Sequence, residues 1–234
     1  MKNTRLTKTK LLCIVVLWCI SSFTTHAQLD YKMAGPFKVV ARDGEFRASK
    51  GGSERDMKAA FDLANIYSNK KASSTADREK AKAKALDIIN AYSSNLERLD
   101  GHDAPLCAIQ CFDMVRAMTI LRDFKTPQWD AMVRNAMLPT IDKFEADSPY
   151  ANGNWGAIVN RLRMAIGIYL QDKDIYQASV DYFYNANDNG ALPKYVSETG
   201  QCQETGRDQA HAQLGLEAIA QTCEMAWQQG DDLW

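Results

Sequence analysis

Residues 204–229 read ETGRDQAHAQLGLEAIAQTCEMAWQQ, and this stretch decides the class of fold. Its apolar residues recur every three or four positions and cover much of a helical circumference; they are Ala210, Leu214, Leu216, Ile219, Ala220, Cys223 and Trp227. Gly230 follows directly, and glycine commonly ends a helix. A helix with so wide an apolar surface is expected in an inner position, covered by other helices on two sides.

The chain before this stretch carries further helix signals. Ser53 and Asp56 resemble a capping box, Thr75 can cap a helix, and Pro105 and Pro127 suit first helical turns. We predict helices over 54–68, 76–99, 105–121, 127–147, 155–170, 174–187 and 204–229, and Pro139 is expected to kink or divide the fourth. No stretch alternates with the period of a strand, so the predicted class is all-α, built from antiparallel helical hairpins.

The distribution of charge predicts two layers of helices. One side of helix 76–99 is strongly charged, which fits an outer layer, whereas the apolar helices 155–170 and 204–229 fit an inner layer. An inner and an outer ring of helices form an α/α toroid. The seven expected helices are too few to close such a ring. We therefore expect an incomplete toroid, which is either open or lacks its C-terminal part.

The N-terminus has the pattern of a secretory signal peptide. Four cations precede the apolar run Leu11–Phe23, and small residues flank His26 before an expected cleavage after about Ala27. The run is too short to span a membrane comfortably. We expect a signal peptide over 1–27, an irregular segment over 28–52 and a toroid domain over 53–234, in a periplasmic or secreted protein.

Net charge and cysteine content narrow the classes of function. Removing residues 1–27 removes four of 28 cations and none of 29 anions, which leaves 24 − 29 = −5. No basic excess is present to hold nucleic acid. Four cysteines remain, namely Cys107, Cys111, Cys202 and Cys223. We interpret them as core or disulfide cysteines, since the remaining histidines lack ligand-like spacing. No metal and no cofactor is expected.

A first polar cluster is NGNWG, residues 152–156. Asn154 either caps the helix that starts here or projects a neutral amide donor into a cleft. Trp155 is either a core tryptophan or a flat platform for a sugar ring. The residues alone leave both alternatives open.

A second cluster is QCQETGRDQAHAQ, residues 201–213. Gln203, Arg207 and His211 are spaced by four and are expected on one helical face. At a helix N-terminus such a face suits an anion, because free N–H groups and the helix dipole add to the guanidinium. The alternative is a solvated first turn in which Arg207 pairs with Glu204 or Asp208.

These residue types favour a reaction that builds negative charge. Glu204 and Asp208 lie one turn apart, so they cannot flank a bond as the two carboxylates of a glycoside hydrolase do. Amide and cationic donors instead suit β-elimination from a uronic acid, where charge grows on the carboxylate. His211 is a candidate for the base that takes the proton or for a group that neutralises the carboxylate. A tyrosine often acts as acid or base, and no spacing singles out one of Tyr150, Tyr169, Tyr182, Tyr184 and Tyr195.

Three stretches resemble the alginate-lyase-domain family of bacterial polysaccharide lyases. They are DREKAKAKALDIINAYSSNL with the following DAPLCAIQ, then NGNWG, then ETGQCQETGRDQAHAQLGLEAIAQTCEMAWQQGDDLW, and the resemblance covers about 55–234. It implies an α/α toroid and eliminative cleavage of alginate or glucuronan. By position, Asn154 resembles the family's carboxylate-neutralising Asn, His211 its active-site His, and Arg207 the Arg one turn earlier.

Further expectations concern the substrate contacts and the catalytic tyrosine. We expect Trp155, Gln203, Glu204 and Gln213 to bind the substrate. The family's catalytic Tyr, with an Arg shortly before it, is expected after Trp234. Two alternatives stay open: a non-catalytic carbohydrate-binding protein or degenerate lyase fragment, and a glycoside hydrolase on the same kind of toroid.

Overall fold

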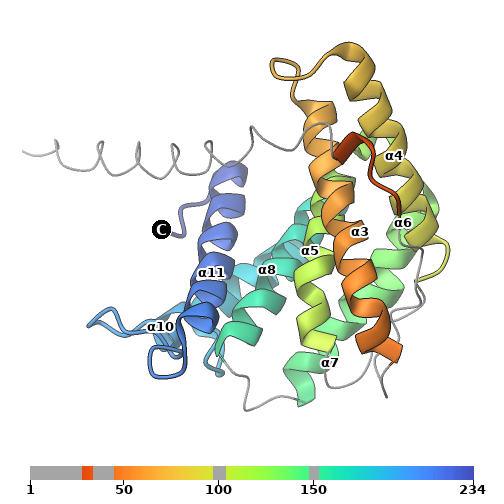
Figure 1. Cartoon of the computed structure of the whole chain (residues 1–234). Coiled ribbons are helices and arrows are strands. Elements are labelled where there is room, and N and C mark those ends of the chain that lie inside the picture. The colour runs from red at the N-terminus through yellow and green to blue at the C-terminus, as the bar shows by residue number, and fades with distance from the viewer. Residues whose placement is uncertain (1–27, 34–44, 97–103, 148–152) are drawn as a thin grey trace, which may run out of the picture.

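The computed structural model describes residues 28–33, 45–96, 104–147 and 153–234 (Figure 1). The helices are α3 (Glu45–Ser68), α4 (Thr75–Ser93), α5 (Ala104–Ile120), the 3₁₀ turn η1 (Arg122–Phe124), α6 (Pro127–Met132), the π-helical turn η2 (Val133–Met137), α7 (Leu138–Asp147), α8 (Gly153–Leu170), α9 (Lys173–Asn185), α10 (Leu192–Tyr195) and α11 (Gln209–Gln229). In these ranges no strand forms, and one isolated bridge joins Val196 to Cys202. The all-α prediction is confirmed.

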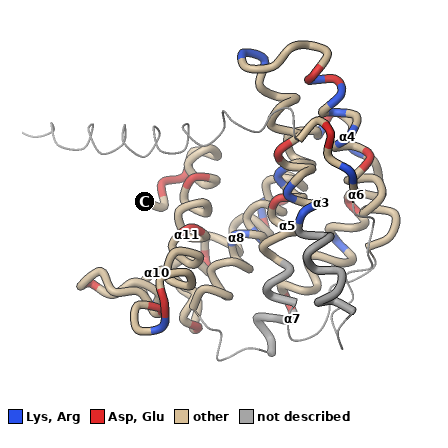
Figure 2. Tube along the Cα trace, viewed as in Figure 1, with Lys and Arg blue, Asp and Glu red and all other residues tan. Residues whose placement is uncertain are grey.

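The helices form two layers. α3, α5, α8 and α11 lie side by side as an inner row, in which each helix packs against the next (Figure 1). α4 packs on α3, α7 on α5 and α9 on α8, and these helices make the outer layer. The charged helix α4 therefore lies in the outer layer as expected, and Figure 2 shows acidic and basic residues mixed along it.

The inner row is curved. One pocket of about 210 Å³ is lined by residues of all four inner helices, from Asn65 of α3 to Gln229 of α11. The first and last helices of a straight row would not meet around one pocket. The lining residues come from the C-terminal halves of all four helices, so these helices run parallel. The described residues form an arc and do not close a ring.

The burial of the inner helices depends on their place in the row. α8 is buried around nearly its whole circumference, as its apolar sequence predicts. α11 packs against α8 on one side, and its other side leaves Leu216 44% and Trp227 50% exposed. The expectation that α11 is covered on two sides is therefore wrong for the described residues, because α11 is the last helix of the row.

Two helix boundaries differ from the sequence prediction. α3 begins at Glu45, inside the segment 28–52 that was expected to be irregular, and it continues through Gly51 and Gly52. Each glycine costs a helix only about 1 kcal/mol, which the packing of the rest of α3 offsets. α4 ends at Ser93, where the hydroxyls of Ser93 and Ser94 both bond to the Asn90 carbonyl and compete with continued helix.

The prediction for Pro139 is confirmed. α6 and α7 are separated by the π-helical turn η2, which ends just before Leu138 and Pro139. Proline cannot donate to the carbonyl four residues earlier, and the wider turn accommodates this gap. The predicted signal peptide lies outside the described residues. Within them, no helix has both the length and the apolar content needed to cross a membrane.

Arg122 joins two neighbours of the inner row. It lies in η1, directly after α5, and its Nη2 donates to the carbonyl oxygens of Ile168 at 2.7 Å and Tyr169 at 3.0 Å. These carbonyls belong to the last turn of α8, where a cation also interacts favourably with the helix dipole. The guanidinium therefore fixes the end of α5 to the end of α8.

We expect Arg122→Gln to lower the free energy of unfolding by about 1–3 kcal/mol, because two charge-assisted hydrogen bonds are lost. Arg134→Gln is the matched control, since Arg134 is half exposed and its nearest acidic oxygen, on Asp172, is 3.9 Å away. The control is expected to change stability by less than about 0.5 kcal/mol. Urea denaturation measures both, and equal losses would contradict the role given to Arg122.

Candidate functional site

Asn154 is an amide buried without partners. It lies in the first turn of α8, its side chain is 0% exposed, and neither its amide nitrogen nor its amide oxygen has a hydrogen-bond partner among the described residues. Because α8 begins at Gly153, Asn154 is inside the helix and is not its cap. Leaving a buried polar group unpaired costs about 1–3 kcal/mol, so such a group needs an explanation.

Two glycines of NGNWG allow close packing around Asn154. An added Cβ on Gly156 would meet the hydroxyl of Tyr182, which donates to Asp188 at 2.6 Å. The other neighbour in the motif, Trp155, is half buried and packs against the main core. This placement agrees with the core interpretation of Trp155.

Tyr195 joins the first turn of α8 to α11. It ends the short helix α10 and is 0% exposed. An added Cβ on Gly153 would lie 2.7 Å from its ring, and one on Gly215 would coincide with its hydroxyl. The ring is therefore wedged between two glycines on different helices. The start of α8 and the early turns of α11 lie at the same end of the inner row (Figure 1).

The hydroxyl of Tyr195 is unusual. It is buried, and the Cys202 thiol is the polar group beside it. Burial raises its pKa above the ordinary value, and the neighbouring Cys202 thiol and Glu204 carboxylate raise it further. The phenol is therefore protonated at neutral pH.

The loop before α11 is tied back to α10. The Gln203 N–H donates to the Tyr195 carbonyl at 2.9 Å, and the Gln203 side-chain amide donates to the Lys194 carbonyl. Glu204 is 4% exposed, and its carboxylate lies 3.5 Å from Arg207. The loop thus holds a buried acid next to a half-exposed guanidinium.

The start of α11 corrects one prediction. The helix begins at Gln209, and Asp208 is its N-cap, accepting from the His211 N–H at 2.9 Å. Gln203 and Arg207 precede the helix, so the expected shared helical face with His211 is wrong. The short Asp208 side chain reaches the free N–H groups of the first turn, as a typical N-cap residue does.

Asp208 also orients the imidazole. Its second oxygen lies 2.6 Å from His211 Nδ1 and 3.8 Å from Arg207 Nε. The His211 N–H and then its ring lower the pKa of the Asp208 carboxyl, with Arg207 adding to the effect. A carboxylate bonded to Nδ1 leaves Nε2 as the ring nitrogen that can take a proton. Arg207 and His211 are therefore brought together by Asp208.

The remaining predicted residues lie around this centre. Gln213 is exposed on α11, two residues after His211. In the described part of the chain, no group of three His, Cys, Asp or Glu side chains is arranged to hold a metal ion. Cys111 and Cys223 are buried and free, Cys202 is partly exposed and free, and the side chain of Cys107 lies outside the description.

Sequence reasoning missed two members of the site. Asp208 could have been found, because an Asp three residues before His211 is a common helix-capping arrangement. Tyr195 could not have been singled out, since its role depends on Gly153 and Gly215, which meet it only in the folded chain.

Together these features define a class of protein: a two-layered helical protein with an amide, a guanidinium and an oriented imidazole at one end of its inner row. The sequence model of the family described as Alginate lyase matches residues 28–234. The chain therefore belongs to the alginate lyase family and is a polysaccharide lyase. No curated protein and no solved structure matches it.

We expect Gly215→Ala to destabilise the protein by at least about 1 kcal/mol, because the new methyl group collides with the Tyr195 hydroxyl. Adding Tyr195→Phe removes the hydroxyl and should recover part of the loss in a double-mutant cycle. Gly206→Ala is the control, since nothing lies within 4 Å of an added Cβ there. Thermal unfolding measures all variants. If Gly215→Ala stabilised the protein, the close contact of Tyr195 with Gly215 would be contradicted.

Cys202 is expected to react first with iodoacetamide in the folded protein. The Thr205 hydroxyl, 3.5 Å from its sulfur, lowers the pKa of the Cys202 thiol. Burial raises the pKa of Cys111 to about 12 and that of Cys223 to about 11. Because the thiolate is the reactive form, peptide mass spectrometry should find Cys202 modified well before the other two. Equal rates would show that the loop is not held as described.

Proposed function

We propose that this chain cleaves alginate or a related 1,4-linked polyuronate by β-elimination, as an exported enzyme. The observation that supports this most is the buried, unpartnered amide of Asn154, at the same end of the inner row as the Asp208–His211 pair. Family membership supports an acidic polysaccharide as substrate. The signal-peptide pattern of residues 1–27 supports a periplasmic or secreted location.

The site residues fit the charge changes of this reaction. His211 Nε2 takes the proton from the carbon beside the uronate carboxylate. The electron pair moves through that carbon and expels the glycosidic oxygen, which leaves a carbon–carbon double bond in the product. Meanwhile negative charge grows on the carboxylate, where the half-exposed Arg207 guanidinium donates hydrogen bonds and where the Asn154 amide, 0% exposed in the free protein, donates once the sugar has displaced the residues that cover it. A guanidinium already held beside Glu204 and Asp208 stabilises this charge with little reorganisation.

An acid must protonate the departing oxygen. The protonated His211 Nε2 can return its proton to that oxygen, and solvent water is the other source. Tyr195 has a different role in this proposal. Its ring holds the starts of α8 and α11 together, so we treat it as a positioning residue.

The residues expected to bind substrate divide into two groups. Gln213 is exposed, but two residues after His211 it points to a different face of α11, so it would reach a sugar only on another side of the helix. Glu204 and Gln203 instead support the site, since Glu204 pairs with Arg207 and the Gln203 amide binds the Lys194 carbonyl. A glycoside hydrolase is disfavoured, because Glu204 and Asp208, the carboxylates next to His211 and Arg207, both lie beside Arg207 and do not flank a cleft from two sides.

The first test follows ultraviolet absorbance of the unsaturated product from alginate and from polyglucuronate. His211→Ala and Asn154→Leu are each expected to lower the rate roughly 100-fold or more, since each removes an interaction used in the transition state. Arg134→Gln and Asn185→Ala are matched controls on exposed residues and should keep the rate. A folded protein without product from any polyuronate would refute the lyase proposal, and binding without cleavage would select a carbohydrate-binding protein.

Asn154→Leu also gives a second readout. The substitution keeps the number and branching of side-chain heavy atoms and removes an amide that has no partner among the described residues, so it is expected to raise the free energy of unfolding by about 1–3 kcal/mol while activity falls. Urea denaturation measures the change. A large loss of stability would show that the amide is structural and would contradict its role in the site.

A further inference from the structure

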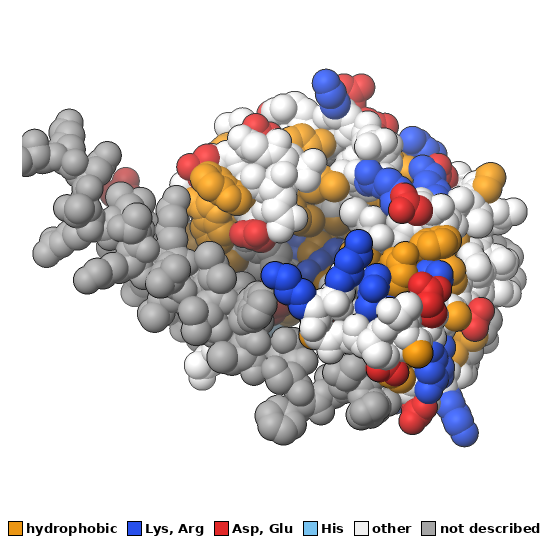
Figure 3. Space-filling model, turned by 90° about the horizontal axis from the view of Figure 1, so that it is seen from above, with side chains coloured by type: hydrophobic (Ala, Val, Ile, Leu, Met, Phe, Trp, Pro, Cys, Tyr) orange, Lys and Arg blue, Asp and Glu red, His pale blue; other side chains and the backbone are white. Residues whose placement is uncertain are grey.

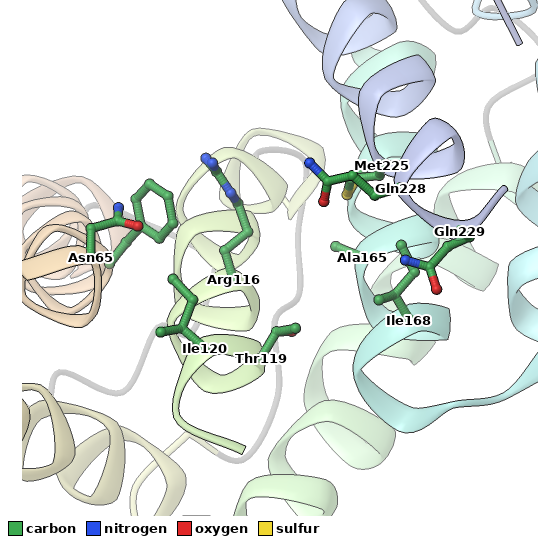
Figure 4. A pocket seen from close by; sticks show the side chains of 10 residues that line it. Asn65, Arg116, Thr119, Ile120, Ala165, Ile168, Met225, Gln228 and Gln229 are labelled. Atoms are coloured by element: carbon green, nitrogen blue, oxygen red, sulfur yellow. The ribbon is translucent and has the colours of Figure 1, made fainter. Parts of the chain in front are cut away.

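A second polar pocket lies at the other end of the inner row. It is the pocket of about 210 Å³ at the C-terminal ends of α3, α5, α8 and α11 (Figure 4). Asn154 and the pocket residue Ile168 are both on α8, and fourteen residues of helix span about 20 Å. One sugar ring therefore cannot touch both places.

Arg116 dominates the chemistry of this pocket. Its guanidinium stacks on the ring of Phe61, with 3.7 Å between its central carbon and the ring centroid. Figure 4 shows the guanidinium extending from α5 between Asn65 of α3 and Gln228 of α11. Stacking on the ring holds the planar group in place and leaves its edge, which carries the N–H donors, free for a ligand.

The donors of Arg116 are largely unused. Its closest acidic partner is Asp113, where Nη1 and the carboxylate oxygen are 3.7 Å apart, beyond hydrogen-bond distance, and the carboxylates of Glu217 and Asp62 act on it without an ion pair. Within the described residues, no hydrogen bond from Arg116 is formed. Burial raises the pKa of the Asp113 carboxyl, although Arg116, Arg161 and Lys58 act to lower it. Asp113 therefore holds its negative charge less strongly than an exposed aspartate does.

The surroundings add amides and an apolar surface. The amides of Asn65, Gln228 and Gln229 line the rim, while Ile168 and Met225 make part of an apolar wall. Viewed from this end, Lys and Arg side chains gather around a hollow in the surface (Figure 3). Amide groups suit sugar hydroxyls, an apolar wall suits the face of a pyranose ring, and a guanidinium fork suits a carboxylate.

We propose that this pocket binds one uronate sugar, with Arg116 holding its carboxylate, as a binding site separate from the elimination site. The choice of a uronate rests on the proposed function. The volume is below the roughly 300–1,000 Å³ of pockets for drug-sized ligands, which fits one sugar ring. The carboxylate distinguishes this ligand from a neutral sugar.

The test titrates full-length protein with sodium glucuronate, with glucose as the neutral match, by ligand-observed NMR. All titrations use the Arg207→Gln background, which removes the guanidinium proposed to hold the carboxylate at the elimination site, so that this site contributes little. Arg116→Gln is expected to weaken glucuronate binding roughly tenfold or more, because a charge-assisted pair is lost. Arg134→Gln, the matched control, should bind as the background does. Asn65→Asp, on an exposed residue, should also weaken binding by repulsion, which covers the case that Arg116→Gln does not fold.

The outcomes separate this proposal from the proposed function. If glucuronate binding depends on Arg116 while the protein without substitutions cleaves no polyuronate, this pocket is supported and the lyase proposal is refuted. An active lyase whose Arg116→Gln and Asn65→Asp variants bind glucuronate unchanged would refute the pocket alone. Equal binding of glucose and glucuronate, or equal binding of inorganic phosphate and glucuronate, would also overturn it, since the site would then not recognise a uronate.

Discussion

The contact of Tyr195 with Gly153 and Gly215 is the constraint on which the site depends. A side chain larger than hydrogen at either glycine would meet the tyrosine ring or its hydroxyl. The two helices can therefore approach only because both positions lack a Cβ. This contact brings Asn154, at the start of α8, to the same end of the molecule as Asp208 and His211, at the start of α11.

The starts of α8 and α11 differ in whether their polar side chains have hydrogen-bond partners. At α11 the polar groups are satisfied, since Asp208 accepts both from a backbone N–H and from the imidazole. At α8 the Asn154 amide is buried without a partner among the described residues. A site that keeps one donor unpaired gives up stability in the free protein, and recovers it when an anionic substrate supplies the missing acceptor. Proteins commonly lose stability at functional sites in this way.

The sequence alone predicted the class of fold and most helices, because apolar periodicity and capping signals are local. The π turn before Pro139 follows from one residue and was also predictable. The start of α11 was predicted at residue 204 and lies at Gln209, because Asp208 caps the helix there and residues 204–207 belong to the loop. Asn154 and His211 could be proposed from residue type and resemblance. Tyr195 and the Arg116 pocket could not, since each is built from residues far apart in the chain.

The packing of Tyr195 between Gly153 and Gly215 also limits how the protein can move. With the ring held between two glycine backbones, α8 cannot slide along α11 without a collision, so the two helix starts move as one block. The loop between Val196 and Asp208, which carries Arg207, is bonded to α10 through Gln203 and therefore moves with the same block. A polysaccharide would then meet a guanidinium and an imidazole whose spacing is set before it arrives.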